Sequence, residues 1–133
     1  MLFIYAPRKR TCCFHANWHT ANGGVYQFGM PRGDPATESG MQVSGALGAN
    51  AINFQPTGSG KAAITGDFLV TGDEVNPLIR ALRASDIEVT AIYSRMLDEQ
   101  PRMFFIHFWA SDDALKLARG VCAALDKTAV AQH

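Results

Sequence analysis

The chain has 133 residues, 12 basic and 12 acidic side chains, a formal net charge of zero and 47% hydrophobic residues. This length and composition are typical of one globular domain that can bury a core of its own. Because neither sign of charge is in excess, the sequence argues against a nucleic-acid partner, and no apolar run is long enough to span a membrane.

The first 22 residues follow neither a helical nor a strand period, and we expect an irregular N-terminal extension over residues 1–22. Its apolar residues precede its basic ones, the reverse of a secretory signal, so the chain as written looks cytoplasmic unless its true start is missing. This stretch contains four potential metal ligands, namely Cys12, Cys13, His15 and His19. Because no helix or strand pattern would hold them together, we expect no metal site there.

The chain has three cysteines, an odd number, and the first two are adjacent in the sequence. We therefore expect no disulfide framework. Cys122 falls on a predicted helix, where its simplest interpretation is a small buried apolar residue.

Three strands are expected before the first helix, at residues 23–30, 49–55 and 62–70. The segment at residues 31–48 is dense in Gly, Pro, Ser and Thr, which predicts a long surface loop with Arg32 and Asp34 in a solvated turn. The later link TGSGK resembles the end of a phosphate-binding loop. It lacks the flanking Gly and the Ser or Thr that this motif needs, and a strand follows it, so we interpret it as a hairpin turn.

Two helices are predicted from apolar stripes with a period of 3.6 residues. The first has Asp73 as its expected N-cap and ends before Ser85, with Glu74 at the positive end of the helix dipole. Its buried stripe is Val75, Leu78, Ile79 and Leu82. The second helix has Ser111 as its expected cap. Its buried stripe is Ala114, Leu117, Ala118, Val121 and Leu125.

A hairpin between the two helices is the most informative stretch. Residues 88–96 alternate, residues 102–109 are apolar on both faces, and a short polar link joins them. The second strand should therefore be central and covered on both sides. The expected register pairs Ala91 with His107, Tyr93 with Phe105 and Arg95 with Met103. Tyr93, Arg95 and His107 then share one face, an inference that a slip of one residue would overturn.

The elements follow one another as strand, strand, strand, helix, strand, strand, helix. Short links join most neighbouring strands, so we expect an α+β fold with two helices packed on a mainly antiparallel sheet of about five strands. Residues 23–128 would form this single domain, and residues 129–133 a frayed tail. The strand at 102–109 could bury its second face against the N-terminal strands, the long loop or another subunit.

Four stretches of the sequence carry a resemblance to a known family: GGVYQFGMPRGDP, NAINFQPTGSGKAAITGDFLVTGDEVNPLIRAL, IEVTAIYSRMLDEQPRMFFIHFWA and KLARGVCAALDKT. They are similar to the LppY/LpqO family, bacterial proteins of unassigned function, many of which are exported or lipoproteins. The resemblance covers residues 23–128 and excludes the first 22. Members of the family tend to be longer, with an export signal and often a second copy of the domain, so the localisation of this chain stays open.

The family pattern has His-x-His where this chain has Tyr93-Ser94-Arg95. With the histidine that matches His107, those two side chains would form a divalent metal site, completed by an acidic residue such as Glu74. In this chain two of the three histidines are replaced. Arg95 would repel a cation and could hold a carboxylate or phosphate instead.

The first hypothesis is a non-catalytic domain that binds a small-molecule or anionic ligand. Its candidate site residues are His107, Tyr93, Arg95, Glu74 and Asn76. One alternative is a metal-binding protein or metal-dependent enzyme with a degenerate site in which His107 remains a ligand. Another is a degenerate copy of the domain that acts by pairing with another chain or, as a homo-oligomer, with a second copy of itself. His107 could equally be a hydrogen-bonded core histidine, and no catalytic arrangement is recognisable from spacing alone.

Overall fold

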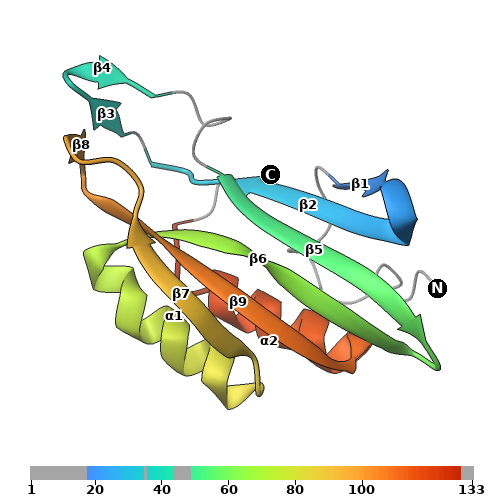
Figure 1. The fold of residues 1–133 in the computed structure, drawn as a ribbon. Coiled ribbons are helices and arrows are strands. Elements are labelled where there is room, and N and C mark those ends of the chain that lie inside the picture. Colours follow the sequence, from blue (N-terminus) through green and yellow to red (C-terminus); the bar gives the residue numbers. More distant parts are fainter. Residues whose placement is uncertain (1–17, 35, 44–48, 130–133) are drawn as a thin grey trace.

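A computed structural model describes residues 18–34, 36–43 and 49–129 of the chain (Figure 1). The elements in chain order are β1 (Trp18–Ala21), the short 3-10 helix η3 (Asn22–Gly24), β2 (Val25–Pro31), β3 (Thr37–Glu38), β4 (Met41–Gln42), β5 (Ala49–Gly58), β6 (Lys61–Thr71), α1 (Gly72–Ala84), β7 (Glu88–Ser94), β8 (Glu99–Gln100), β9 (Met103–Asp113) and α2 (Ala114–Leu125).

The described strands pair antiparallel in two sheets. The main sheet has six strands in the order β1-β2-β5-β6-β9-β7, and a small sheet has three in the order β4-β3-β8. Both helices lie on one face of the main sheet (Figure 1). The expected α+β fold, with a mainly antiparallel sheet and two packed helices, is therefore confirmed.

The outermost strand of the main sheet, β1, comes from the segment that was expected to be irregular. It pairs with β2, so that Trp18 lies opposite Phe28 and Ala21 opposite Val25. The prediction of an irregular stretch is therefore wrong for residues 18–21. Four residues are too few to establish an alternation in the sequence, and this strand depends on the edge that β2 offers for pairing.

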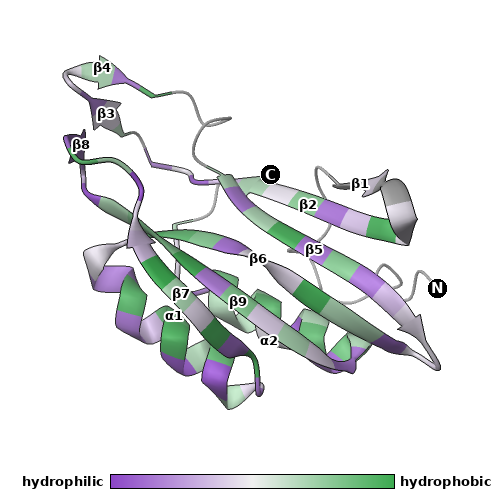
Figure 2. Ribbon diagram, in the orientation of Figure 1, coloured by the Kyte–Doolittle hydropathy of each residue, from purple (hydrophilic) through white to green (hydrophobic). Residues whose placement is uncertain are grey.

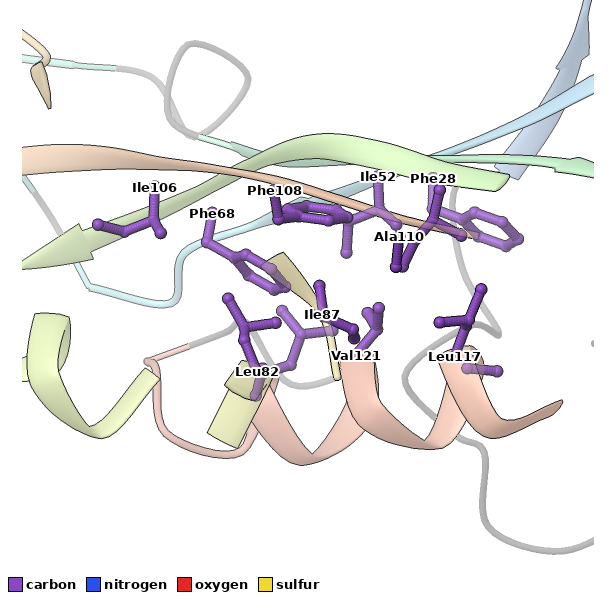
Figure 3. Close-up of a cluster of buried hydrophobic side chains, with 14 of the residues drawn as sticks. Phe28, Ile52, Phe68, Leu82, Ile87, Ile106, Phe108, Ala110, Leu117 and Val121 are labelled. Atoms are coloured by element: carbon purple, nitrogen blue, oxygen red, sulfur yellow. The ribbon is translucent and has the colours of Figure 1, made fainter. Parts of the chain in front are cut away.

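Alternation along the strands places one set of apolar side chains between the main sheet and the two helices (Figure 3). The largest of them are four phenylalanines that are at most 1% exposed, Phe28, Phe54, Phe68 and Phe108. The rings of Phe68 and Phe108 are 4.9 Å apart between centroids. Leu82 of α1 and Val121 of α2 point toward the sheet from below. The alternation of hydrophobic and hydrophilic residues along the strands and around α1 is visible in Figure 2.

Both helices form where the apolar stripes predict them, but each begins at a different residue from the expected cap. The N-cap of α1 is Thr71, whose N–H donates to Glu74 Oε1 at 2.9 Å, in place of Asp73. The N-cap of α2 is Asp113, which accepts from the Lys116 N–H at 3.0 Å, in place of Ser111. The second difference arises because β9 keeps pairing with β6 as far as Asp113.

The register predicted for the hairpin of β7 and β9 is confirmed. Ala91 lies opposite His107 and Tyr93 opposite Phe105, and the Arg95 N–H donates to the Met103 carbonyl at 3.0 Å. The strand β9 is interior, between β6 and β7.

Within a single chain, β9 is covered on both sides over only part of its length. The helices cover one face, but Trp109, on the other face, is 45% exposed. Phe105, further along that same face, packs with a small apolar cluster of Ala36, Leu69 and Met103. The rest of the second face is therefore left uncovered by the described residues of this chain, and cover by another subunit stays a prediction.

The segment predicted as a long surface loop contains the short strands β3 and β4, and β3 pairs with β8 to complete the small sheet. Arg32, expected in a solvated turn, is instead buried, with only 4% of its side chain exposed. The link TGSGK forms the hairpin turn between β5 and β6, with Gly58 opposite Lys61. That interpretation is confirmed.

Cys122 packs against the core, partly buried, but it is also disulfide-bonded, so its interpretation as simply a small buried apolar residue is incomplete. Spacing could not reveal this bond, because it depends on which segments meet in three dimensions. Cys12, Cys13 and His15 lie outside the described residues. No helix in the described part of the chain has the length and apolar character needed to cross a membrane.

Candidate functional site

The face of the main sheet that carries no helix, called the open face here, has two rows of register partners running across the strands. One row consists of Gly29, Ala51, Asp67, His107 and Ala91. The neighbouring row consists of Gln27, Asn53, Thr65, Trp109 and Glu88. Because the intervening residues of these strands point into the core, both rows face away from the helices.

Asp67 joins two of the predicted site residues. Its Oδ1 atom accepts a hydrogen bond from the Tyr93 hydroxyl at 3.1 Å and lies 2.9 Å from His107 Nδ1. The Asp67 side chain is 25% exposed and that of His107 is 39% exposed. The ring of Tyr93 also contacts the ring of Phe105, with 5.4 Å between centroids. A carboxylate, an imidazole and a phenol thus meet at the surface of the open face.

Thr65 occupies the other side of the imidazole. Its Oγ1 atom lies 3.2 Å from His107 Nε2 and donates to the Phe108 carbonyl at 2.9 Å. A hydroxyl carries one proton, so while that bond is made the Thr65 oxygen can only accept from Nε2. If the hydroxyl proton turns to Nε2 instead, Nε2 accepts and Nδ1 carries the proton that faces Asp67. Both ring nitrogens are engaged in either arrangement.

These four side chains, Asp67, His107, Tyr93 and Thr65, are called the Asp67 cluster below. Partial burial, together with the nearby Asp67 carboxylate and its hydrogen bond, raises the pKa of the Tyr93 hydroxyl above its ordinary value. Tyr93 therefore acts as a hydrogen-bond donor to Asp67 at neutral pH.

A groove of about 420 Å³ lies on the open face beside this cluster and shares Thr65 with it. Its lining residues are Val25, Gln27, Asn53, Gln55, Ala63, Ile64, Thr65 and Trp109. None of the eight carries a formal charge. Asn53 is held in place by a bond from its Nδ2 atom to the Thr65 carbonyl at 3.3 Å. The volume falls within the range of small-molecule sites.

Arg95 does not join the Asp67 cluster. Its Nε atom donates to Glu99 Oε1 at 2.6 Å, and its Nη2 atom contacts the same oxygen. Glu38 is the register partner of Glu99 in the small sheet, and the Oε2 atoms of both are buried without a hydrogen bond from any described residue. Arg95 therefore compensates the charge of the buried Glu99 carboxylate and is not directed toward the groove.

Glu74 and Asn76, the other two predicted site residues, are also placed elsewhere. Asn76 is exposed on α1. Glu74 accepts hydrogen bonds from Arg32 Nη1 at 2.6 Å and from the Ala129 N–H at 3.0 Å. Arg32 also binds Asp34 through two bonds of 2.8 Å. Together they form the Arg32 network, which ties the start of α1 to the segment after β2.

The electrostatics of the Arg32 network are those of a structural ion pair. The hydrogen bond from Arg32 lowers the pKa of Asp34 despite its partial burial. Burial alone would raise the pKa of Glu74, but the hydrogen bonds from Arg32 and from the Thr71 N–H outweigh it, and the pKa is lowered. Both carboxylates are therefore ionised at neutral pH.

Sequence reasoning missed Asp67, Thr65 and Asn53, which all belong to the open face. One signal was present: Asp67 is the only charged residue in the predicted strand at 62–70. An acidic residue inside an otherwise apolar strand marks a polar contact on one face.

A metal ion at this site would require a nitrogen of His107, and both are hydrogen-bonded. Within the described residues, no group of three or more His, Cys, Asp or Glu side chains is placed to hold a metal ion. The divalent metal suggested by the family resemblance stays a prediction, and it would require Thr65 or Asp67 to release the ring.

The fold and the site define an α+β domain whose sheet is covered by helices on one face and carries a polar cluster and a groove on the other. Residues 15–127 match the family described as Domain of Unknown Function (DUF1259), and the chain belongs to that family. The name LppY/LpqO stays a prediction. Comparisons with curated proteins and with solved structures give no match.

Proposed function

We propose that this protein binds a small polar molecule on its open face without transforming it chemically. The observation that carries the proposal is the position of the Asp67 cluster, at the surface and directly beside the groove. Oriented polar groups next to an uncovered concave surface are the usual ingredients of a ligand site. A role of His107 in stability alone would not account for the groove beside it.

The charge distribution does not favour the anionic ligand considered from the sequence. Arg95 is engaged by Glu99, and the lining of the groove is uncharged. The carboxylate of Asp67, in the cluster beside the groove, would repel an anion. An uncharged ligand therefore fits the site better than a carboxylate or a phosphate.

The proposal is tested by thermal unfolding in the presence of a library of small metabolites grouped by charge, together with Zn²⁺ and Mn²⁺. A molecule that binds the folded state raises the unfolding temperature in a concentration-dependent way. His107→Ala should abolish the shift, whereas Gln42→Ala, an exposed change in the small sheet, should preserve it. If every compound left the wild type unshifted, the proposal would be wrong. A shift by Zn²⁺ or Mn²⁺ alone would favour the metal hypothesis.

A second candidate function is pairing with a second copy of the chain, favoured by the exposure of β7. In the described part of the chain β7 pairs only with β9, and Ile92 and Tyr93 on it are 52% and 46% exposed. The segment at residues 90–94 has no charged side chain, so antiparallel pairing of two copies would oppose no like charges. Light scattering should then find a dimer that Ile92→Lys dissociates. A monomer at all concentrations would exclude this pairing.

A further inference from the structure

We infer that the groove accepts an uncharged polyhydroxylated ring, the chemistry of a neutral sugar. This inference rests on the proposed function and adds the class of ligand to it. Three properties of the groove carry it: the hydrogen-bonding groups of its lining, a half-exposed indole, and the lack of charge among its lining residues.

The first property is the chemistry of the side chains that line the groove. Gln27, Asn53 and Gln55 are carboxamides, and each offers a donor and an acceptor within one rigid plane. Thr65 adds a hydroxyl oxygen that can accept a further hydrogen bond while its proton is donated to the Phe108 carbonyl. A ligand whose hydroxyls both donate and accept is matched by such a lining, whereas a purely accepting anion would leave the carbonyl oxygens without partners.

These polar groups are arranged as a row. Gln27, Asn53, Thr65 and Trp109 are successive register partners on four adjacent strands, which are spaced about 4.8 Å apart. Hydroxyls distributed around a ring could therefore meet several strands at once. The side chain of Asn53 is already oriented by its bond to the Thr65 carbonyl. Less conformational entropy is then lost when a ligand binds.

The second property is Trp109, the aromatic member of this row, which lies between Thr65 and Glu88 in the register. Its side chain is 45% exposed although it stands on an interior strand, where burial would be the normal outcome for an indole. The ring of a sugar has an apolar face of C–H groups around which its hydroxyls project. An exposed indole that lines the same groove as these amides can cover such a face and bury apolar area on both partners.

The third property is the uncharged lining. A charged ligand would lose its hydration shell in the groove without gaining an ion pair there. A neutral polyol loses only hydrogen bonds to water, and the amides replace them. The small side chain of Ala63 and the open space above Gly29, where an added Cβ would meet nothing within 4 Å, leave room for a ring.

The test uses the fluorescence of Trp109 in the full chain. The protein has two tryptophans, so Trp18→Phe serves as the background that isolates the signal of Trp109. The probes are glucose, galactose, mannose, maltose and cellobiose, with glucuronate, glucosamine and adenosine as charged or flat comparators. The inference predicts a saturable change with at least one neutral sugar. Glucuronate should bind at least about tenfold more weakly than its neutral counterpart, glucose.

Substitutions in the groove then distinguish the loss of a ligand contact from the loss of the folded structure. Asn53→Ala and Gln55→Ala should each weaken sugar binding about tenfold, the effect of one lost hydrogen bond. In calorimetry, Trp109→Ala should eliminate the binding heat, Trp109→Phe should retain part of it, and Gln42→Ala should match the wild type. Thermal unfolding of each variant verifies that it is folded.

Two outcomes would overturn the inference, and they differ in what they imply for the proposed function. Trp109-dependent binding of adenosine or glucuronate, without any neutral sugar, would refute the ligand class while leaving ligand binding on the open face intact. If no probe binds and the metabolite library also produces no thermal shift, both the ligand class and the proposed function are wrong.

Discussion

Along β9, successive side chains stand in two different environments, and the contrast separates stability from function. Ile106 and Phe108 point into the core and are completely buried, whereas His107 and Trp109, between and beyond them, reach the open face. The inward residues gain their free energy from the burial of apolar surface. The outward residues remain partly hydrated, so little of the folding free energy depends on them and they are available to contact a ligand.

A similar contrast holds between the two networks of charged side chains. In the Arg32 network the guanidinium is buried and bonded to two carboxylates and a backbone carbonyl, so each of its charges has a partner inside the protein. In the Asp67 cluster the carboxylate and the imidazole stay partly exposed. A buried network is costly to disturb, while a half-exposed one can exchange a partner for a ligand.

The largest expected effect is a substitution on the inward side of β9. Phe108→Ala should lower the free energy of unfolding by about 3–5 kcal/mol, because it leaves a cavity among the phenylalanines of the core. Trp109→Ala, one residue further along, should cost less than about 1 kcal/mol because its ring is half exposed. Urea unfolding of the two variants measures both values. Equal losses would mean that the open face is covered in solution.

The second largest loss in the free energy of unfolding is expected from the removal of Arg32. Arg32→Met keeps most of the side-chain volume but leaves Asp34 and Glu74 without their buried partner, at a cost of about 3 kcal/mol. Denaturant unfolding at neutral pH provides the measurement. A loss as small as that of an exposed ion pair would show that water replaces the guanidinium, and the contrast between the two networks would disappear.

The same network predicts a dependence of stability on pH. The pKa values of Asp34 and Glu74 are lowered from ordinary values of 3.8 and 4.5, so the unfolded chain binds protons at a higher pH than the folded protein does. Their contribution is full above about pH 4.5 and is lost as the pH falls through the lowered values. Thermal unfolding at a series of acidic pH values should record this loss. Arg32→Met should weaken the dependence of the unfolding temperature on pH. An unchanged dependence would assign the acid sensitivity to other groups.

The smallest effect is expected in the Asp67 cluster. Asp67→Asn and His107→Ala should each change the free energy of unfolding by about 1 kcal/mol or less, because both side chains are partly hydrated. Their effect should instead be seen in the ligand-induced thermal shift. A destabilisation as large as that of Arg32→Met would identify His107 as a structural residue, which is the alternative that the sequence left open.

Several features of the fold follow from local patterns alone. The helix stripes, the turn at TGSGK and the pairing of Ala91 with His107 were predictable, since a 3.6-residue period, a Gly-rich link and a short hairpin restrict the geometry within a few neighbouring residues. The helix caps were not, because residues of equal capping ability, such as Ser111 and Asp113, compete. How far β9 stays paired with β6 decides between them.

The candidate site was only half predictable for the same reason. His107 and Tyr93 belong to one hairpin and were found together, but Asp67 reaches them only through the pairing of β6 with β9, 40 residues along the chain from His107. Arg95 follows Tyr93 closely in sequence and nonetheless turns to Glu99.

The apolar period of each element and the register of the local hairpin follow from the sequence, because these depend on neighbouring residues. The tertiary structure decided which strands became neighbours in the sheet, that Arg32 is buried, and that Trp109 stays uncovered. Those outcomes depend on contacts between distant segments, whose free energies sum over the whole molecule and are not encoded in any short pattern.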